Sequence, residues 1–242
     1  MALIPSKDKA LAFYYGRGRL AQLSRYHKVV LQPWAYTRSE LALLRSRRTL
    51  PLAYLSLGED QAVPSPWHRD ARNLDWNTVY VDPSHPGWVS SRLEEAQRAI
   101  EQGFVGLFLD TLDTVMLFPQ DRQAMLGLIA QLRDRLGSVL LFANRGFPLL
   151  PDLLGLVDGV VLESFSTTWT PWGYRVLPSY ELEYNLSCLY RLQGSPLELY
   201  ALDYADSFWL EGFARLRAMY YGLPTFVSNR ELTRIRGQPE VC

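Results

Sequence analysis

Eight short apolar segments recur along this chain, each with the length of a β-strand. Many are rich in Val, Phe or Tyr, which are common strand residues. The fourth segment reads as an unbroken apolar run, which is typical of a parallel strand buried on both faces. The eight segments are residues 11–15, 29–34, 52–59, 105–110, 139–144, 159–164, 197–203 and 225–229.

Segments with helical spacing lie between these strands. Residues 90–102 carry apolar side chains at 3.6-residue spacing and stop at Gly103, and residues 121–136 do the same before Gly137. Further helices are expected at residues 18–26, 39–47, 148–155, 180–193 and 207–221.

Eight strands that alternate with helices predict an α/β fold, a single (β/α)8 TIM barrel over residues 1–242. A doubly wound sheet is the alternative, but Gly16-Arg-Gly18 is too short for the phosphate loop expected there. Residues 58–89 are expected to form a long irregular segment after the third strand, and loops of that length are often functional.

Charge and composition exclude several partners. The chain has 25 basic and 25 acidic residues and no net charge, so it gives no support for binding nucleic acid or a membrane surface. No apolar run reaches the roughly 18 residues of a membrane span. Without a signal-peptide pattern we expect a cytoplasmic protein, although an extracellular protein whose signal had been removed would look the same. Nothing in the sequence indicates an oligomeric state.

The active site of a TIM barrel lies at the carboxyl ends of its strands. Carboxylates dominate at those ends here, and His and Lys are absent from them. This argues against a Schiff-base aldolase, a His-rich metal centre and a phosphate site, so neither a metal nor a cofactor is expected. Two carboxyl groups with aromatic walls are typical of a glycosidase.

Asp110 and Glu163 are the candidate catalytic residues, because each directly ends an apolar strand. In such pairs one carboxyl group serves as the general acid while the other stays ionised. The alternative for either residue is that it caps the next helix or pairs with Arg145.

Several residues near the strand ends are candidates for substrate binding. The carboxylates and Asn144 would hold hydroxyl groups or a substrate amine, although Asp113 could equally cap the next segment. The aromatic rings would stack on sugars or belong to the core, and the Trp169–Trp172 pair lies in a Pro/Gly loop that suggests a binding surface. The candidates are Tyr15, Trp34, Glu59, Asp113, Asn144, Trp169, Trp172, Asp203 and Tyr204.

Motifs spread in order over nearly the whole chain resemble a known family. They are Tyr54-Leu-Ser-Leu-Gly-Glu59, Trp76-Asn-Thr-Val-Tyr-Val-Asp82-Pro, Trp88, Gly103-Phe-Val-Gly-Leu-Phe-Leu-Asp110-Thr-Leu-Asp113, Asn144, Asp158-Gly-Val-Val-Leu-Glu163-Ser, Leu202-Asp203-Tyr204 and Tyr221-Gly-Leu-Pro-Thr-Phe-Val-Ser228. Together they resemble glycoside hydrolase family 114, the endo-α-1,4-polygalactosaminidases and their relatives. The chain departs from the family pattern at Val105, where Asp is usual, and at Thr111, where Asn is usual.

The resemblance implies a TIM-barrel glycosidase that cleaves internal α-1,4 links of a galactosamine-containing polysaccharide without a cofactor. It implies Asp110 and Glu163 as the catalytic pair, and analogy with other retaining barrels makes Asp110 the nucleophile and Glu163 the acid/base. An acidic site suits such a polymer, which is cationic when deacetylated. A non-catalytic carbohydrate-binding barrel is the main alternative, and a phosphosugar isomerase is a weaker one.

Overall fold

The computed structural model describes residues 10–61 and 63–235, which belong to two compact units. One unit holds the residues up to Leu52 together with those from Val161 onward, and the other holds Ala53–Val160. The boundaries fall inside two strands, β3 (Leu50–Ser56) and β9 (Gly159–Glu163). The backbone of each of these strands therefore belongs to both units.

The main sheet contains the eight predicted strands. Hydrogen bonds join them in chain order. The pairs β1/β2, β7/β8 and β12/β13 are parallel. With β3 and β9, the sheet comprises β1 (Leu11–Tyr14), β2 (Lys28–Leu31), β7 (Gly106–Asp110), β8 (Leu140–Asn144), β12 (Glu198–Tyr204) and β13 (Thr225–Ser228).

The first and last strands of this sheet are also neighbours. The rings of Phe13 on β1 and Phe226 on β13 lie 6.1 Å apart, and the backbone N–H of Tyr15 donates to the carbonyl of Leu232. Parallel strands that alternate with helices, with the last strand beside the first, are the (β/α)8 arrangement. The predicted TIM barrel is therefore confirmed.

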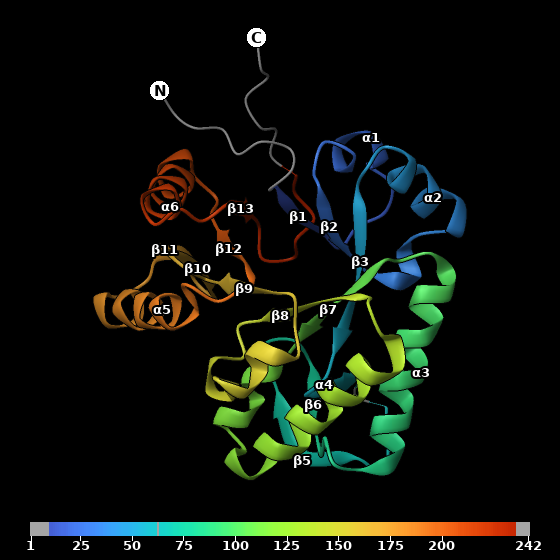
Figure 1. Ribbon diagram of the computed structural model, residues 1–242. Coiled ribbons are helices and arrows are strands. Elements are labelled where there is room, and N and C mark those ends of the chain that lie inside the picture. Colours follow the sequence, from blue (N-terminus) through green and yellow to red (C-terminus); the bar gives the residue numbers. More distant parts are fainter. Residues whose placement is uncertain (1–9, 62, 236–242) are drawn as a thin grey trace. The chain divides into compact units, whose positions relative to one another are not determined.

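Helices occupy the connections between strands, and Figure 1 shows α6 beside β12. The prediction of an α-helix at residues 148–155 is wrong. Pro148 and Pro151 break that segment into two short 3₁₀ turns, because proline cannot continue an α-helix. The α-helices are α1 (Leu20–Leu23), α2 (Arg38–Ser46), α3 (Pro86–Gln102), α4 (Arg122–Leu136), α5 (Ser179–Leu192) and α6 (Phe208–Tyr220). The 3₁₀ turns are η2 (Pro33–Ala35), η3 (Leu112–Met116), η4 (Pro119–Asp121), η5 (Phe147–Leu149) and η6 (Asp152–Gly155).

The segment expected to be irregular after β3 is instead a small antiparallel sheet. Its strands are β4 (Glu59–Gln61), β5 (His68–Asn73) and β6 (Thr78–Val81), in the order β4, β6, β5. The indole of Trp67 anchors it by donating to Asp60 at 2.7 Å and by packing 5.9 Å from the ring of Trp88. Trp88 is fully buried and donates to the carbonyl of Leu57, so the small sheet is fixed to the end of β3.

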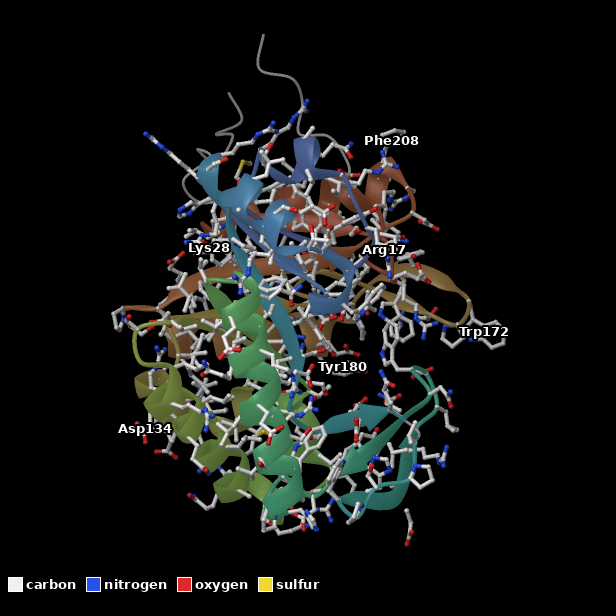
Figure 2. The ribbon with its side chains drawn as sticks, turned by 90° about the vertical axis from the view of Figure 1, so that its right-hand side faces the viewer. Arg17, Lys28, Asp134, Trp172, Tyr180 and Phe208 are labelled. Carbon is white, nitrogen blue, oxygen red and sulfur yellow. The ribbon has the colours of Figure 1, made fainter. Side chains whose placement is uncertain are left out.

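The loop expected to carry Trp169 and Trp172 is a hairpin of β10 (Thr167–Thr170) and β11 (Gly173–Val176). Gly173 has a φ of +126°, which a side chain would oppose, and this conformation closes the tight turn. Trp172 projects from the tip of the hairpin (Figure 2).

Within the part of the chain that the structure describes, no helix is long and apolar enough to cross a membrane.

Candidate active site

Asp110 is the last residue of β7 and is held by both neighbouring strands. Its Oδ2 accepts a hydrogen bond of 2.8 Å from the hydroxyl of Tyr54 on β3. Its Oδ1 accepts one of 2.7 Å from the side-chain amide of Asn144, the last residue of β8. Asp110 is half-buried and Asn144 is buried. Both carboxylate oxygens therefore have a fixed direction, and Asn144, predicted to contact substrate, contacts Asp110 in this structure.

The turn after Asp110 is strained and heavily bonded. Thr111 has a φ of +64°, which is unfavourable for a β-branched residue. Its hydroxyl accepts from the backbone N–H groups of Leu57 and Gly58, at 3.2 and 2.7 Å. A Cβ at Gly58 would lie 2.5 Å from the carbonyl oxygen of Thr111, so only glycine permits this approach. The end of β3 thus packs directly on the turn that follows Asp110.

Asp113 forms an ion pair that joins the turns after β7 and β8. Its Oδ2 lies 2.7 Å from Nε of Arg145, and its Oδ1 accepts from the backbone N–H of Gly146. Arg145 is therefore a counter-charge of Asp113. The pairing with Asp110 or Glu163 that the sequence left open stays a prediction. The engaged carboxylate favours a structural role over the predicted substrate contact.

Glu59 is held within the small sheet. Its carboxylate accepts from Nδ2 of Asn73 at 3.1 Å and from the hydroxyl of Thr78 at 2.5 Å. Next to it, Asp60 accepts from Trp67 and His68. Burial alone would raise the pKa of Asp60. These hydrogen bonds, together with the backbone N–H of Gln61 and the charge of Arg92, outweigh burial and hold the pKa below its usual value. The substrate contact expected for Glu59 stays a prediction.

Glu163 is the last residue of β9 and is half-buried. Its Oε1 accepts a short hydrogen bond from the hydroxyl of Tyr204, the last residue of the neighbouring strand β12. Only 2% of the Tyr204 surface is exposed, and its hydroxyl orients the candidate acid/base. The predicted stacking on a sugar ring stays a prediction.

Asp203 is completely buried, and its predicted contact with substrate stays a prediction. Its Oδ1 accepts from the backbone N–H groups of Ser166 and Thr167, at 2.6 and 2.8 Å. Burial raises its pKa to about 6, against the opposing effect of those N–H groups and of Arg217. Asp203 therefore fixes the turn that follows Glu163, and Arg217 supports the same turn by donating to the carbonyl of Phe165.

The remaining predicted residues present aromatic surface. Trp34 is 65% exposed beside the guanidinium of Arg17, and Trp172 is 94% exposed. Trp169 is half-buried under the guanidinium of Arg230, which lies 3.8 Å from the ring centroid. Tyr15 is half-buried directly after β1. Their exposure is compatible with sugar stacking, and that role stays a prediction for each.

One backbone feature is shared by Asp110, Asn144 and Glu163. Each is followed by a residue other than glycine in the left-handed region, a conformation that costs free energy and clusters at functional sites. The φ values are +64° at Thr111, +54° at Arg145 and +50° at Ser164. A sharp turn therefore follows the strand at all three positions.

Comparison with known proteins identifies the class of enzyme. No family model matches the chain. The glycoside hydrolase domain of PelA from Pseudomonas aeruginosa is 30% identical, with a TM-score of 0.87, over 93% of this chain and 96% of that one. The chain belongs to the family 114-like glycoside hydrolases. The family, the barrel and the enzyme class expected from the sequence are thus confirmed.

Two further relatives are more distant from this glycoside hydrolase. Ega3 of Aspergillus fumigatus, solved in complex with galactosamine, shares the fold with a TM-score of 0.70 and 12% identity, over 96% of each chain. The uncharacterized protein MJ1477 of Methanocaldococcus jannaschii is 29% identical over 100 residues. That match covers 36% of this chain and 29% of MJ1477, so it spans less than a third of that curated relative.

Sequence reasoning missed the orienting role of Tyr54, Asn144 and Tyr204 in this glycoside hydrolase, because it took Asn144 and Tyr204 for substrate contacts. Tyr54 lies inside a motif quoted for the family, but nothing in the motif separates a positioning tyrosine from a core one. For β12 the signal was present. Adjacent strand residues point to opposite faces, so Asp203 and Tyr204 could not both face the same site.

Proposed function

We propose that this glycoside hydrolase cleaves α-1,4 links in a galactosamine-containing polysaccharide, with Asp110 as nucleophile and Glu163 as general acid/base. One observation carries the assignment of residues. Each carboxylate is the last residue of a strand of the main sheet, and each accepts a hydrogen bond from a tyrosine on a neighbouring strand. The galactosamine bound to Ega3 supports the substrate class.

In the proposed reaction, Glu163 donates its proton to the glycosidic oxygen while Asp110 attacks the anomeric carbon. The bond to the leaving sugar breaks, and a covalent glycosyl–Asp110 intermediate forms. Glu163, now ionised, takes a proton from water, which displaces Asp110 and releases the sugar. Tyr54 and Asn144 hold the two oxygens of the nucleophile, so it is aligned before substrate arrives.

The charges that could attract an amino sugar are fewer than the sequence suggested. Arg145 neutralises Asp113, and Asp203 is inaccessible. The hydrogen bonds described for Asp110 and Glu59 come from uncharged donors, so those carboxylates are the better candidates for meeting a substrate amine. We therefore expect deacetylated galactosaminan to be a better substrate than the acetylated polymer.

Release of reducing ends from acetylated and deacetylated galactosaminan tests the function. We expect Asp110→Asn and Glu163→Gln each to lower kcat by about 1000-fold or more. Asp134→Asn is the matched control, because Asp134 is an exposed carboxylate on α4 (Figure 2). Full activity in either catalytic variant would make the assignment wrong, and polymer binding by the wild type without new reducing ends would favour the non-catalytic barrel.

Azide separates the two roles. In a Glu163→Ala variant, azide attacks the glycosyl–Asp110 intermediate and gives a product that retains the anomeric configuration. In an Asp110→Ala variant, azide takes the place of the missing carboxylate and gives the inverted product. Proton NMR of the anomeric position reads the outcome, and an exchange of the two products would reverse the assigned roles.

Three further proposals concern the domain, cofactor and location of this enzyme. We propose that residues 1–242 act as one catalytic domain. We also propose that the enzyme needs no cofactor, which activity that survives prolonged dialysis against a chelator would support. Finally, we propose that it acts in the cytoplasm, which cell fractionation tests. The substrate needed as a partner is a polysaccharide or oligosaccharide.

A further inference from the structure

A stripe of exposed apolar side chains runs along α6, on a face that the proposed reaction does not use. The α6 stripe consists of the exposed Phe208, Trp209, Leu216, Met219 and Tyr220, together with the partly buried Phe213. Most of its members are separated by three or four residues, so they share one face of the helix. Phe208 is 89% exposed and Tyr220 82%, while Trp209 and Leu216 are exposed by about two thirds.

The opposite face of α6 already has its partner within the same unit. Leu210 and Ala214 are buried against Val227 of β13 in one apolar cluster. A surface helix normally has one apolar face, which packs on the core, and a polar face toward solvent. Here the solvent side is also apolar, and Phe208 projects outward from the start of the helix (Figure 2).

The size of the α6 stripe matches a protein interface. A large aromatic side chain buries roughly 150–250 Å², so the exposed parts of the stripe offer about 600–700 Å² in total. The largest apolar patch of a typical monomer is about 300–600 Å², and a stable complex needs about 800 Å² from each partner. The stripe therefore supplies most of one standard interface.

The charges on α6 permit a second copy of the same chain as the occupant. No member of the α6 stripe is charged. On the flank of the helix, Glu211 and Arg215 neutralise each other through an ion pair of 2.9 Å. Two stripes can therefore be buried against each other without bringing like charges together.

The two ends of α6 both carry exposed aromatic side chains. Phe208 and Trp209 protrude at the first turn, and Tyr220 is exposed at the last turn. The helix is about 20 Å long. In an antiparallel pair, the first turn of each copy would lie against the last turn of the other, which is the isologous pattern of a twofold dimer.

We propose that the α6 stripe is a self-association surface, through which two copies of this protein pair with their α6 helices antiparallel. Sedimentation velocity of the full chain over a wide concentration range tests this, because a dimer gains population with protein concentration. Leu216→Glu places a charge at the centre of the stripe and should raise the dimer dissociation constant at least about 10-fold. Leu74→Glu is the matched control, since Leu74 is 89% exposed and lies outside the stripe.

Disulfide trapping in a Cys242→Ser background tests the orientation. Phe213→Cys lies near the centre of the stripe, so in an antiparallel pair it would meet its counterpart and form a dimer under mild oxidation. Phe208→Cys lies at one end and should not cross-link to its own counterpart. A protein that is monomeric at every concentration, or a dimer that Leu216→Glu leaves unchanged, would overturn the proposal. Binding of the stripe to lipid vesicles by a monomer would overturn it as well.

Discussion

Tyr204 donates its hydroxyl hydrogen to Oε1 of Glu163, and this bond joins the ends of two neighbouring strands. The same arrangement occurs at the other proposed catalytic carboxylate, where Tyr54 of β3 donates to Asp110 at the end of β7. Both proposed catalytic carboxylates thus take their orientation from a tyrosine on an adjacent strand. The strand supplies the position and the tyrosine supplies the direction.

Removal of the Tyr204 hydroxyl should slow the reaction without blocking substrate binding. We expect Tyr204→Phe to lower kcat by about 10- to 100-fold with little change in KM, because Glu163 would lose its fixed orientation. The pH–rate profile should shift, since a hydrogen bond to the proposed acid/base changes. Tyr200→Phe is the control, because Tyr200 is a buried tyrosine on the same strand that donates to Glu198 instead. Wild-type kcat and an unchanged profile in Tyr204→Phe would leave Tyr204 with a structural role only.

The two donors to Asp110 should act as a unit. Tyr54→Phe and Asn144→Ala each remove one hydrogen bond to the carboxylate, and we expect each to lower kcat by about 10- to 100-fold. Because both serve the same group, the double variant should lose less than the product of the two single effects. Single-turnover kinetics on an aryl glycoside would show whether formation of the covalent intermediate is the affected step. Strict multiplicativity would mean that the two side chains act independently.

The sequence predicted the barrel because its strands carry the consecutive apolar residues that a parallel strand buried on both faces requires. Each predicted strand is a short apolar run that ends in a polar or aromatic residue, and helical segments lie between these runs. The small sheet after β3 lacks such an apolar run. Its strand His68–Asn73 is polar and largely exposed, so neither apolar periodicity nor apolar runs could reveal it.

At the site, the sequence located the two carboxylates but not the direction of their neighbours. Asp113, Asn144 and Asp203 were all read as substrate contacts because they follow or end strands. In the structure, Asp113 forms an ion pair with Arg145 and Asn144 donates a hydrogen bond to Asp110, while Asp203 is buried. Those pairings join residues more than 30 positions apart, which composition and local spacing cannot specify.

Asp203 should make the stability of the protein fall as pH rises from about 4 to about 6. The folded-state pKa of about 6 lies above the usual value of 3.8 for an aspartate, so the folded protein holds a proton that the unfolded chain has lost in this range. The loss is bounded by about 3 kcal/mol and should be complete above the folded-state pKa. Urea unfolding at a series of pH values measures it.

Asp203→Asn is the variant that isolates this effect. The amide is neutral and keeps an oxygen for the N–H groups of Ser166 and Thr167. We expect the decline of stability between pH 4 and 6 to flatten in this variant. Asp206→Asn serves as control, because Asp206 is exposed three residues further along. An identical slope in the Asp203 variant would show that other groups cause the pH dependence.

Thr111 combines stabilising hydrogen bonds of its side chain with an unfavourable backbone conformation. At φ +64° a β-branched residue is strained, while Asn tolerates this region. The Thr111 hydroxyl also serves the N–H groups of Leu57 and Gly58. Thr111→Ala keeps an unfavourable φ and loses these bonds, so we expect a loss of about 1–3 kcal/mol in the free energy of unfolding. Thr111→Asn should be clearly more stable than Thr111→Ala, because its side-chain oxygen can accept from Gly58.

Arg48→Asn separates the two contributions at Thr111. Arg48 is exposed and has a φ of +58°, so its replacement tests backbone tolerance alone, with an expected gain of up to about 1 kcal/mol. The difference between the changes at the two sites then measures the hydrogen bonds of the Thr111 side chain. Because this turn directly follows Asp110, Thr111→Ala should also lower kcat, whereas Arg48→Asn should not. If Thr111→Ala matched the wild type in urea unfolding and in kcat, these bonds would contribute neither to stability nor to the orientation of Asp110.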